Sequence, residues 1–388
     1  MINIEIKGVQ FSNKGAELML LSILAQLEKE IGEYNLVLSP GPNLPYKKRA
    51  QLGAFQKLSF RRGSVDLTGL FGKLPHIIKR LLKRYGIVTE ADVDVILNAS
   101  GFSYGDQWPL NDLKNAAKEA VRFKKAGKPY MVLPQALGPF KKADHAAAAR
   151  TLINAASKVY PRDKASFQAC EALNSSGSLQ QSPDFTALIE PEIIEPFATK
   201  TVCFIPNNKV VSSYHHETAQ SGTEAYIGFW RHQVELFQQS GFDVVLLNHE
   251  GVEDRLLCEA IAKGIESKVD IVDGLGAIEI KAFLGRCDAV VSSRFHGCVS
   301  ALSQGVPCLA TSWSHKYEML FEEYGIEENI LDYLASTEEV SAKVEQFING
   351  LDEQKNASSA HAAQVKNENN AMWQSVIAEI NSYQSKLS

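Results

Sequence analysis

Several features that define common protein classes are missing from this sequence of 388 residues. No apolar run approaches the roughly 20 residues of a membrane-spanning helix, and no leader-like segment precedes the first apolar stretch, so we expect neither an integral membrane protein nor a secreted one. The six cysteines form no CxxC pair, which predicts reduced thiols in a cytoplasmic protein. The formal net charge of −5 argues against nucleic-acid binding through bulk electrostatics.

Motifs for nucleotide phosphates and metals are also absent. Neither GxGxxG nor GxxxxGK[ST] occurs, although the loop Asn13-Lys14-Gly15 resembles a phosphate cradle, with a plain tight turn as the alternative. The histidines lack the spacing of zinc ligands, and we interpret them as solvated loop residues: His215, His216, His232 and His249. We therefore expect no metal and no resident cofactor.

What the sequence does contain is the strand and helix alternation that builds parallel sheets. Strands are predicted at 2–7, 35–39, 93–98, 130–133, 158–160, 201–206, 242–248, 269–272, 289–292 and 308–311, with helices such as 253–263 between them. An acidic, proline-bracketed segment at 190–196 interrupts this pattern. We predict two α/β, Rossmann-like domains over 1–195 and 196–350, and a polar linker with a C-terminal helix over 351–388.

The stretch Cys287 to Glu318 is the strongest candidate site. An apolar strand ends at residue 292, and a helix begins at Arg294 and His296. Such a helix start offers free backbone N–H groups and the positive end of the helix dipole. Arginine supplies a planar cation for phosphate or carboxylate, and histidine transfers protons near neutral pH. The pattern predicts an anion site, to which Lys316 at the exit of the next strand would contribute; a capped and ion-paired surface helix is the alternative.

Further candidates follow other predicted strands. Two such domains joined by a short hinge would place the carboxyl ends of both sheets along one cleft, where open sheets bind ligands. Arg162 is a second cation, with a salt bridge to Asp163 or a helix cap as the alternative. Asp184 is a candidate acid or base, with a plain turn as the alternative. The remaining loop candidates are Asn13, Gly15, Glu17, Gly101, Gln135 and Asn207, and Gly297 is expected to admit close backbone approach.

A basic amphipathic stretch runs from Lys73 to Arg84. Together with Arg61 and Arg62 it could contact an anionic membrane surface or a lipid-linked phosphate, and an ordinary surface helix is the alternative.

These motifs resemble the polysaccharide pyruvyl transferase family, whose two-domain fold is similar to that of GT-B glycosyltransferases. The resemblance runs from about Gly8 to Gly325. Its most specific part is Ala289 to Gly297, continued by Ala301, Gly305-Val306-Pro307 and Lys316, and the weaker matches are Asn13-x-Gly15-x-Glu17, Gln135-x-x-Gly138, Arg162-Asp163 and Pro183-Asp184. Two departures affect the domain that would face the acceptor: Ala16 stands where the family usually has Asp, and Asn98-Ala99-Ser100-Gly101 stands where glycines normally cluster.

The resemblance implies transfer of a pyruvyl group from phosphoenolpyruvate, as co-substrate, to two hydroxyls of a sugar in a polysaccharide or its precursor, forming a cyclic ketal. It implies that Arg294, Arg162, Lys316 and Gly297 bind phosphoenolpyruvate. His296 would shuttle the proton, with Asp184 as a further candidate, and the loop candidates would face the acceptor.

Two alternatives stay open at this point. A GT-B glycosyltransferase would use the same cations for a nucleotide diphosphate and Glu318 for the ribose. A non-catalytic module would bind sugar or anion without reaction. The expected location is the cytoplasm, at the inner face of the membrane, and the acceptor's identity and carrier and the oligomeric state are left open.

Overall fold

The computed structural model describes residues 1–62, 65–174, 177–192, 194–210, 219–312 and 314–387. Its contacts divide the chain into two units. Unit 1 comprises Met1–Ser12, Met19–Phe185 and Glu368–Ser388, and unit 2 comprises Asn13–Leu18 and Thr186–Asn367. The chain therefore leaves unit 1 after Phe185, ten residues before the expected boundary, and the start of the first helix belongs to unit 2.

Unit 1 is built on a seven-stranded sheet with the order β6-β3-β2-β1-β7-β8-β9, in which every neighbouring pair is parallel. The sequence predicted five of these strands but not β3 and β6, which at three and two residues are too short to show a periodicity. The strands are β1 (Ile2–Lys7), β2 (Tyr34–Leu38), β3 (Phe55–Lys57), β6 (Ile87–Val88), β7 (Val95–Asn98), β8 (Tyr130–Gln135) and β9 (Lys158–Pro161), with a separate antiparallel pair β4 (Arg61–Arg62) and β5 (Val65–Asp66).

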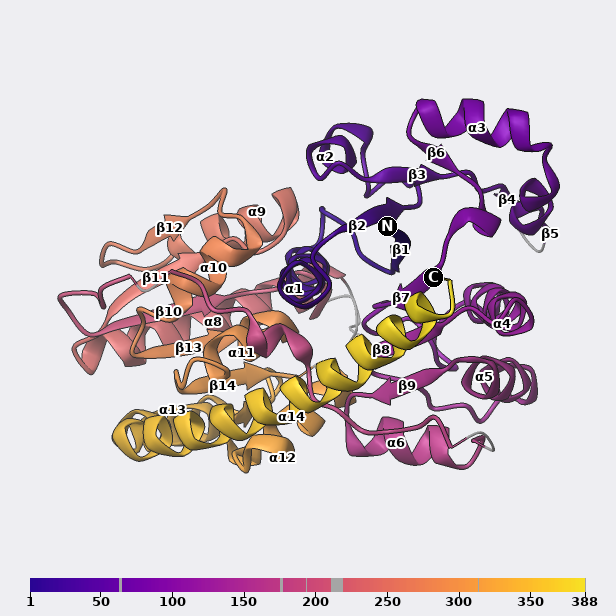
Figure 1. Cartoon of the computed structure of the whole chain (residues 1–388). Coiled ribbons are helices and arrows are strands. Elements are labelled where there is room, and N and C mark those ends of the chain that lie inside the picture. Colours follow the sequence, from indigo (N-terminus) through magenta and orange to yellow (C-terminus); the bar gives the residue numbers. More distant parts are fainter. Residues whose placement is uncertain (63–64, 175–176, 193, 211–218, 313, 388) are drawn as a thin grey trace. The chain divides into compact units, whose positions relative to one another are not determined.

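Helices flank this sheet, and Figure 1 shows α4, α5 and α6 beside β7, β8 and β9. All six residues of β8 are buried, as expected for a parallel strand covered on both faces. The helices are α1 (Lys14–Glu30), α2 (Tyr46–Gln51), η1 (Thr68–Lys73), α3 (His76–Arg84), η2 (Glu90–Asp92), α4 (Leu110–Lys125), α5 (Ala143–Ala155), α6 (Lys164–Glu171) and η3 (Phe185–Leu188).

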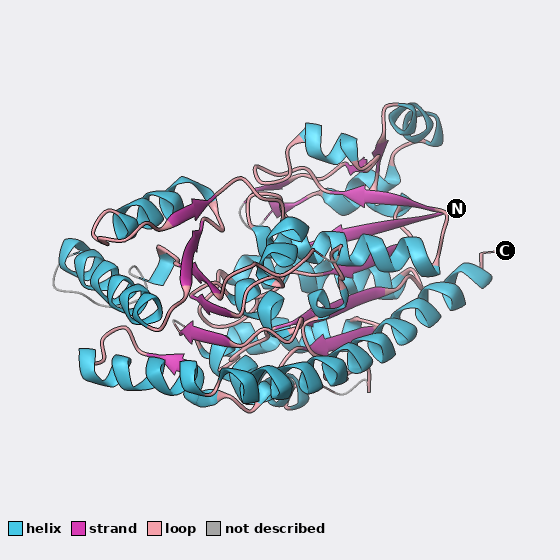
Figure 2. Ribbon diagram, turned by 90° about the vertical axis from the view of Figure 1, so that its left-hand side faces the viewer, coloured by secondary structure: helices cyan, strands magenta, loops and turns pink. Residues whose placement is uncertain are grey.

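Unit 2 is built on a six-stranded parallel sheet with the order β12-β11-β10-β13-β14-β15. Successive residues of β10 point to opposite faces, so Val202 and Phe204 enter one core cluster and Cys203 and Ile205 enter another. The strands are β10 (Thr201–Ile205), β11 (Asp243–Leu247), β12 (Asp270–Val272), β13 (Ala289–Ser292), β14 (Cys308–Thr311) and β15 (Ile330–Leu331). The helices are α8 (Ala219–Gln239), α9 (Gly251–Ala262), α10 (Ala277–Leu284), α11 (Phe295–Leu302), α12 (His315–Tyr324), η4 (Glu327–Asn329) and α13 (Thr337–Asn349). Figure 2 shows the strands running between helices.

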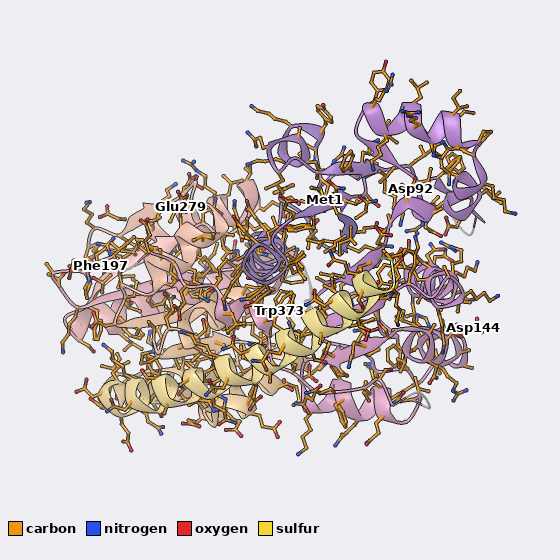
Figure 3. The ribbon with its side chains drawn as sticks, viewed as in Figure 1. Met1, Asp92, Asp144, Phe197, Glu279 and Trp373 are labelled. Carbon is orange, nitrogen blue, oxygen red and sulfur yellow. The ribbon has the colours of Figure 1, made fainter. Side chains whose placement is uncertain are left out.

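The C-terminal segment is one helix, α14 (Leu351–Ser385), of 35 residues. This corrects the expected polar linker: the segment is polar, but it contains neither glycine nor proline, so nothing in it stops a helix. The last turns of this helix pack within unit 1. Trp373, labelled in Figure 3, is buried within unit 1 with its ring centroid 6.0 Å from that of Phe185, and Val376 and Ile380 are buried as well.

Among the described helices, none combines the length and the apolar character needed to cross a membrane.

Candidate active site

The strand order of unit 2 reverses at β10, which lies between β11 and β13. Ligands of open parallel sheets bind outside the carboxyl ends of strands at such a point. The loop after β10 carries Asn207, whose Nδ2 donates to the carbonyl oxygen of Ser293, after β13, at 3.0 Å. The Tyr317 hydroxyl donates to the same carbonyl at 2.7 Å, and the Tyr226 hydroxyl donates to Ser293 Oγ at 2.8 Å. The turn that precedes Arg294 is therefore firmly held.

Gly297 lies in the first turn of α11, which follows this turn. A Cβ at Gly297 would lie 2.6 Å from Ser292 Oγ and 3.0 Å from Ile205 Cδ1. The glycine thus lets α11 pack closely against the ends of β10 and β13. The backbone N–H of Arg294 donates to Ser292 Oγ at 3.0 Å, which holds the start of the helix.

Arg294 is 7% exposed, and its guanidinium is bonded to two carboxylates. Nε donates to Asp254 Oδ2 at 3.0 Å, and the terminal nitrogens form ion pairs with Asp254 and Glu250. Burial raises the pKa of Asp254, against the opposing effect of Arg294. Sequence reasoning missed both carboxylates. The available signal was their position after β11, the neighbour of β10, but the strand order that brings them to Arg294 was not known.

The start of α1 completes the group around Arg294. Asn13 Oδ1 accepts the backbone N–H of Ala16 at 3.0 Å, which caps the helix, while Asn13 Nδ2 donates to Glu250 Oε2 at 3.0 Å. A Cβ at Gly15 would lie 2.1 Å from Nδ1 of His296, so the imidazole packs directly on the bare backbone of Gly15. The structure therefore brings Asn13, Gly15, Arg294 and His296 together within unit 2. Glu17, one turn on, forms an ion pair with Lys14 at 2.9 Å.

His249 was expected to be a solvated loop residue, and this expectation is wrong: it is 5% exposed. Burial, followed by the positive charges of Arg294, His296 and Lys14, lowers its pKa well below the ordinary value. His249 is therefore neutral at neutral pH. His249 follows β11, which ends at Leu247, and therefore lies on the same loop as Glu250.

The structure does not place the other histidines considered in the sequence analysis beside His249. His232 is half-buried on α8, where its Nε2 lies 2.8 Å from Ser341 Oγ, and His215 and His216 lie outside the described residues. In the described part of the chain, no group of three His, Cys, Asp or Glu residues is arranged to hold a metal ion.

Lys316 lies in the first turn of α12. Its Nζ is 5.4 Å from the ring centroids of both Phe295 and Tyr317, which places the ammonium beside the start of α11. Glu318, the ribose ligand of the glycosyltransferase alternative, is exposed on the same helix.

The candidates of unit 1 form a second group. Arg162 Nη1 donates to Asp184 Oδ2 at 3.0 Å, and both side chains are buried. The backbone N–H of Arg162 donates to the carbonyl oxygen of Gln135 at 3.0 Å. Asp163 caps α6 by accepting the N–H of Ser166 at 2.7 Å, so the structure pairs Arg162 with Asp184 instead of Asp163. Gly101 has φ +69°, a conformation that favours glycine.

The architecture matches known structures across nearly the whole chain. A putative UDP-N-acetylglucosamine 2-epimerase from Listeria monocytogenes has a TM-score of 0.61 at 12% identity, covering 99% of this chain and 96% of that one. A UDP-GlcNAc 2-epimerase from Neisseria meningitidis, solved with UDP-GlcNAc, has a TM-score of 0.59 at 9% identity, covering 97% and 100%. The spinosyn rhamnosyltransferase SpnG has a TM-score of 0.52 at 13% identity, covering 99% and 100%. At these identities the likeness shows the fold alone, which is GT-B-like.

The sequence comparisons are more specific about the family. No curated protein matches the chain. The profile of the family described as polysaccharide pyruvyl transferase matches residues 13–315. This range begins at Asn13, includes Arg162, Arg294 and His296, and ends immediately before Lys316. The chain belongs to the polysaccharide pyruvyl transferase family and is therefore a transferase.

Proposed function

We propose that this protein transfers the pyruvyl group of phosphoenolpyruvate to two hydroxyls of a sugar in a polysaccharide or its precursor, forming a cyclic ketal. The observation that carries the proposal is the pairing of a buried arginine with a histidine at the start of α11, within a chain of this family. A cation that binds the donor's anionic groups and a proton donor are what the donor chemistry requires.

The donor carries a phosphate and a carboxylate on three carbons, so it needs closely spaced cations. Arg294 and Lys316, beside the N-terminus of α11, supply two of them. Arg162 remains a further candidate for the donor's second anionic group. Glu250 is the more exposed of the two carboxylates on Arg294, with 18% of its side chain accessible against 2% for Asp254. The donor phosphate would therefore replace Glu250, while Asp254 keeps the guanidinium oriented.

His296 would protonate the methylene carbon of the enol, which makes the central carbon electrophilic. A sugar hydroxyl adds to that carbon, the bond to the phosphate oxygen breaks, and the second hydroxyl closes the ring. One hydroxyl proton replaces the proton given by His296, and the other leaves with the phosphate. Asp184 is the second candidate for these proton transfers, and Gly15 fixes the imidazole of His296.

The direct test is mass spectrometry of candidate glycans after incubation with phosphoenolpyruvate and the full-length protein. The expected result is a pyruvyl ketal, with turnover lowered about 10² to 10⁴-fold in His296→Ala. His232→Ala, which removes a histidine that contacts Ser341 on α13, is the matched control and should remain active. Near-normal turnover in His296→Ala would remove this residue from the role.

Ligand-induced thermal shifts separate the alternatives. Stabilisation by nucleotide sugars and not by phosphoenolpyruvate would replace the proposal with glycosyl transfer. Binding of phosphoenolpyruvate and glycan without ketal formation would indicate a binding module. If the donor phosphate replaces Glu250, Glu250→Gln should bind phosphoenolpyruvate more tightly and Arg294→Lys more weakly. Weaker binding in Glu250→Gln would contradict that arrangement.

We also propose that unit 1 contacts an anionic membrane surface through α3, at the cytoplasmic face. None of the residues of α3 is buried, and its apolar side is open: Ile77 is 77%, Leu81 54% and Ile78 41% exposed. Five cations and no acidic residue lie between positions 73 and 85, although the chain as a whole carries a net charge of −5. An exposed apolar stripe beside cations suits the boundary between lipid headgroups and acyl chains.

Figure 1 shows α3 as a separate helix next to β6. The six free, buried cysteines fit a reducing compartment.

Sedimentation with lipid vesicles tests this contact. The protein should bind vesicles that contain phosphatidylglycerol and not pure phosphatidylcholine, and Ile77→Gln/Leu81→Gln should abolish the binding. Leu256→Gln is a matched control, because Leu256 is an equally exposed leucine, at 58%, on α9 of unit 2. Unchanged binding in the double variant would contradict the proposal.

A further inference from the structure

Unit 1 has its own crevice at the carboxyl ends of its strands. The strand order of its sheet reverses at β1, which lies between β2 and β7, and open sheets bind ligands outside such a point. A cavity of about 550 Å³ lies there, and its lining includes Lys7 at the end of β1, Ser100 after β7 and the first turns of α4. Small-molecule sites typically measure about 300 to 1,000 Å³. Of the residues named from the sequence, Arg61 and Ser100 line this cavity, whereas the loop candidates and the residues expected to bind phosphoenolpyruvate do not.

Two cations, Lys7 and Arg61, line one side of the cavity. Lys7 forms an ion pair with Glu119, and Arg61 Nη2 lies 3.2 Å from the same carboxylate. Lys57 also pairs with Glu119, at 2.7 Å, so three cations share this one group. Burial lowers the pKa of Lys7, against the opposing effect of Glu119. Since 15% of the Lys7 side chain and 31% of the Arg61 side chain are accessible, an anion could reach both.

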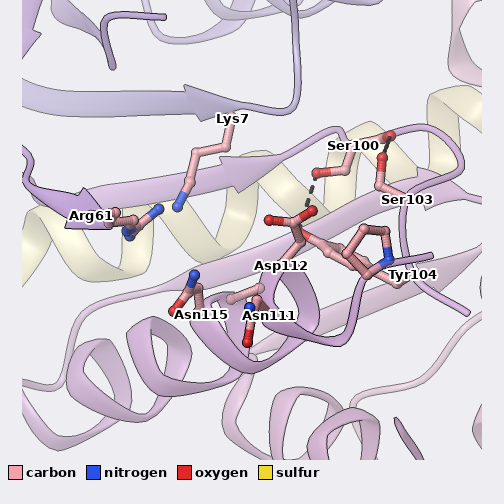
Figure 4. Close-up of a pocket in the computed structure, with 10 residues that line it drawn as sticks. Lys7, Arg61, Ser100, Ser103, Tyr104, Asn111, Asp112 and Asn115 are labelled. Carbon is pink, nitrogen blue, oxygen red and sulfur yellow. Dashed lines mark hydrogen bonds between the residues drawn. The ribbon is translucent and has the colours of Figure 1, made fainter. Parts of the chain in front are cut away.

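Hydrogen-bonding groups of α4 line the rest of the cavity. Asn111 and Asp112 belong to the first turn of this helix, and Asn115 follows one turn later. Asn111 and Asp112 are exposed and Asn115 is half-buried, so their polar groups are accessible to a ligand. In Figure 4, Lys7 and Arg61 lie together on one side, and Ser103 lies on the other side with Ser100. The cavity thus combines a cationic side with amide and carboxylate groups, which are the groups that bind sugar hydroxyls.

We propose that this cavity binds an acceptor sugar that carries an anionic group, either a phosphate or a carboxylate. The anion would lie against Lys7 and Arg61, and the sugar hydroxyls would bond to Asn111, Asp112 and Asn115. Identification of this sugar as the acceptor rests on the proposed pyruvyl transfer, whereas the binding itself does not. A neutral sugar offers no charge to the accessible parts of these two cations, so the cavity should discriminate between sugars by charge.

Calorimetric titration of the full-length protein without phosphoenolpyruvate tests the inference. The probes are glucose, galactose and mannose, each as the free sugar, the 1-phosphate and the uronic acid, together with inorganic phosphate. At least one anionic sugar should bind tenfold more tightly than its neutral counterpart and than inorganic phosphate. Whichever series binds more tightly, the sugar 1-phosphates or the uronic acids, identifies the anionic group as phosphate or carboxylate. Equal affinity for neutral and anionic sugars, equal affinity for inorganic phosphate, or no binding by any anionic sugar would overturn the proposal.

Two variants locate the bound sugar. Arg61→Gln should weaken the binding of the anionic sugar at least tenfold, while Asp112→Ala should weaken anionic and neutral sugars by the same factor. Lys114→Gln removes an exposed cation of the same helix, with 45% of its side chain accessible, and should change nothing. These side chains are more exposed than Lys7, so the variants should keep the fold, and circular dichroism checks this. An unchanged affinity in Arg61→Gln would overturn the assignment.

The outcomes for this cavity and for pyruvyl transfer are distinguishable. Selective binding of an anionic sugar that no phosphoenolpyruvate-dependent reaction consumes would sink the transferase proposal alone. Ketal formation on a neutral glycan, with no binding of anionic sugars, would sink this inference alone.

Discussion

Substitution of Gly15 by alanine should disable the protein while leaving it folded. The new Cβ would lie 2.1 Å from Nδ1 and 2.6 Å from Cγ of His296. Carbon contacts are normally about 3.5 to 4.0 Å, so the imidazole must move by on the order of 1.5 Å. A ring at the end of a side chain can make this movement at little cost, and alanine in place of a helical glycine by itself stabilises by up to about 1 kcal/mol. The free energy of unfolding should therefore change by no more than about 1 kcal/mol.

Turnover should respond far more strongly than stability. A misplacement of about 1 Å in a catalytic group costs on the order of 10²-fold in rate. We expect Gly15→Ala to lower phosphoenolpyruvate-dependent ketal formation by about that factor or more. In a His296→Ala background the same substitution should have no further effect, because the group it displaces is already gone.

The assay compares turnover by mass spectrometry with stability from urea denaturation. Gly228→Ala on α8 is the matched control, because nothing lies within 4 Å of a Cβ at Gly228, and it should stabilise the protein without changing turnover. Full activity of Gly15→Ala would refute the positioning of His296 by Gly15. A loss of several kcal/mol in the unfolding free energy of Gly15→Ala would refute the argument that the His296 imidazole moves aside at little cost.

Three further predictions concern stability. The pKa of His249 is depressed in the folded state, so the unfolded chain binds the proton first as the pH falls below about 6.5. This difference should lower the free energy of unfolding by about 2 kcal/mol between pH 6.5 and pH 5. Urea denaturation across this range should show that the free energy of unfolding of His249→Gln falls less with pH than that of the unchanged protein. A variant of the exposed His76 should follow the unchanged protein. The same fall with pH in His249→Gln and in the unchanged protein would contradict the assignment. Glu119→Gln leaves the buried cations around this carboxylate short of a partner and should cost about 3 to 5 kcal/mol of unfolding free energy, so a loss below about 1 kcal/mol would mean that the remaining carboxylates compensate. Trp373→Ala should cost about 3 to 5 kcal/mol because the indole is buried at 2% exposure, and an unchanged denaturation midpoint would show that the end of α14 is not docked.

The accuracy of the sequence-based predictions depended on whether each element carries a local apolar pattern. Ten predicted strands appear in the two sheets, because short apolar runs between helical or turn segments are local signals. The strands β3, β6 and β15, of two or three residues, carry no such signal. The segment 356–369 was misassigned because a polar composition is shared by linkers and by helices with one wet face.

The sequence by itself determined the two parallel sheets, the helix start at Arg294 and His296, and the membership of the family, because each depends on neighbouring residues or on a run of motifs. Only the tertiary structure decided which groups face that start. Asp254 and Glu250 reach Arg294 from 40 and 44 positions away, and Gly15 reaches His296 from 281 positions away. The cavity of unit 1 joins Lys7 to a helix that begins at Leu110. The contacts of Arg294 and the lining of the cavity follow from the order of the strands in each sheet, which no local stretch of sequence specifies.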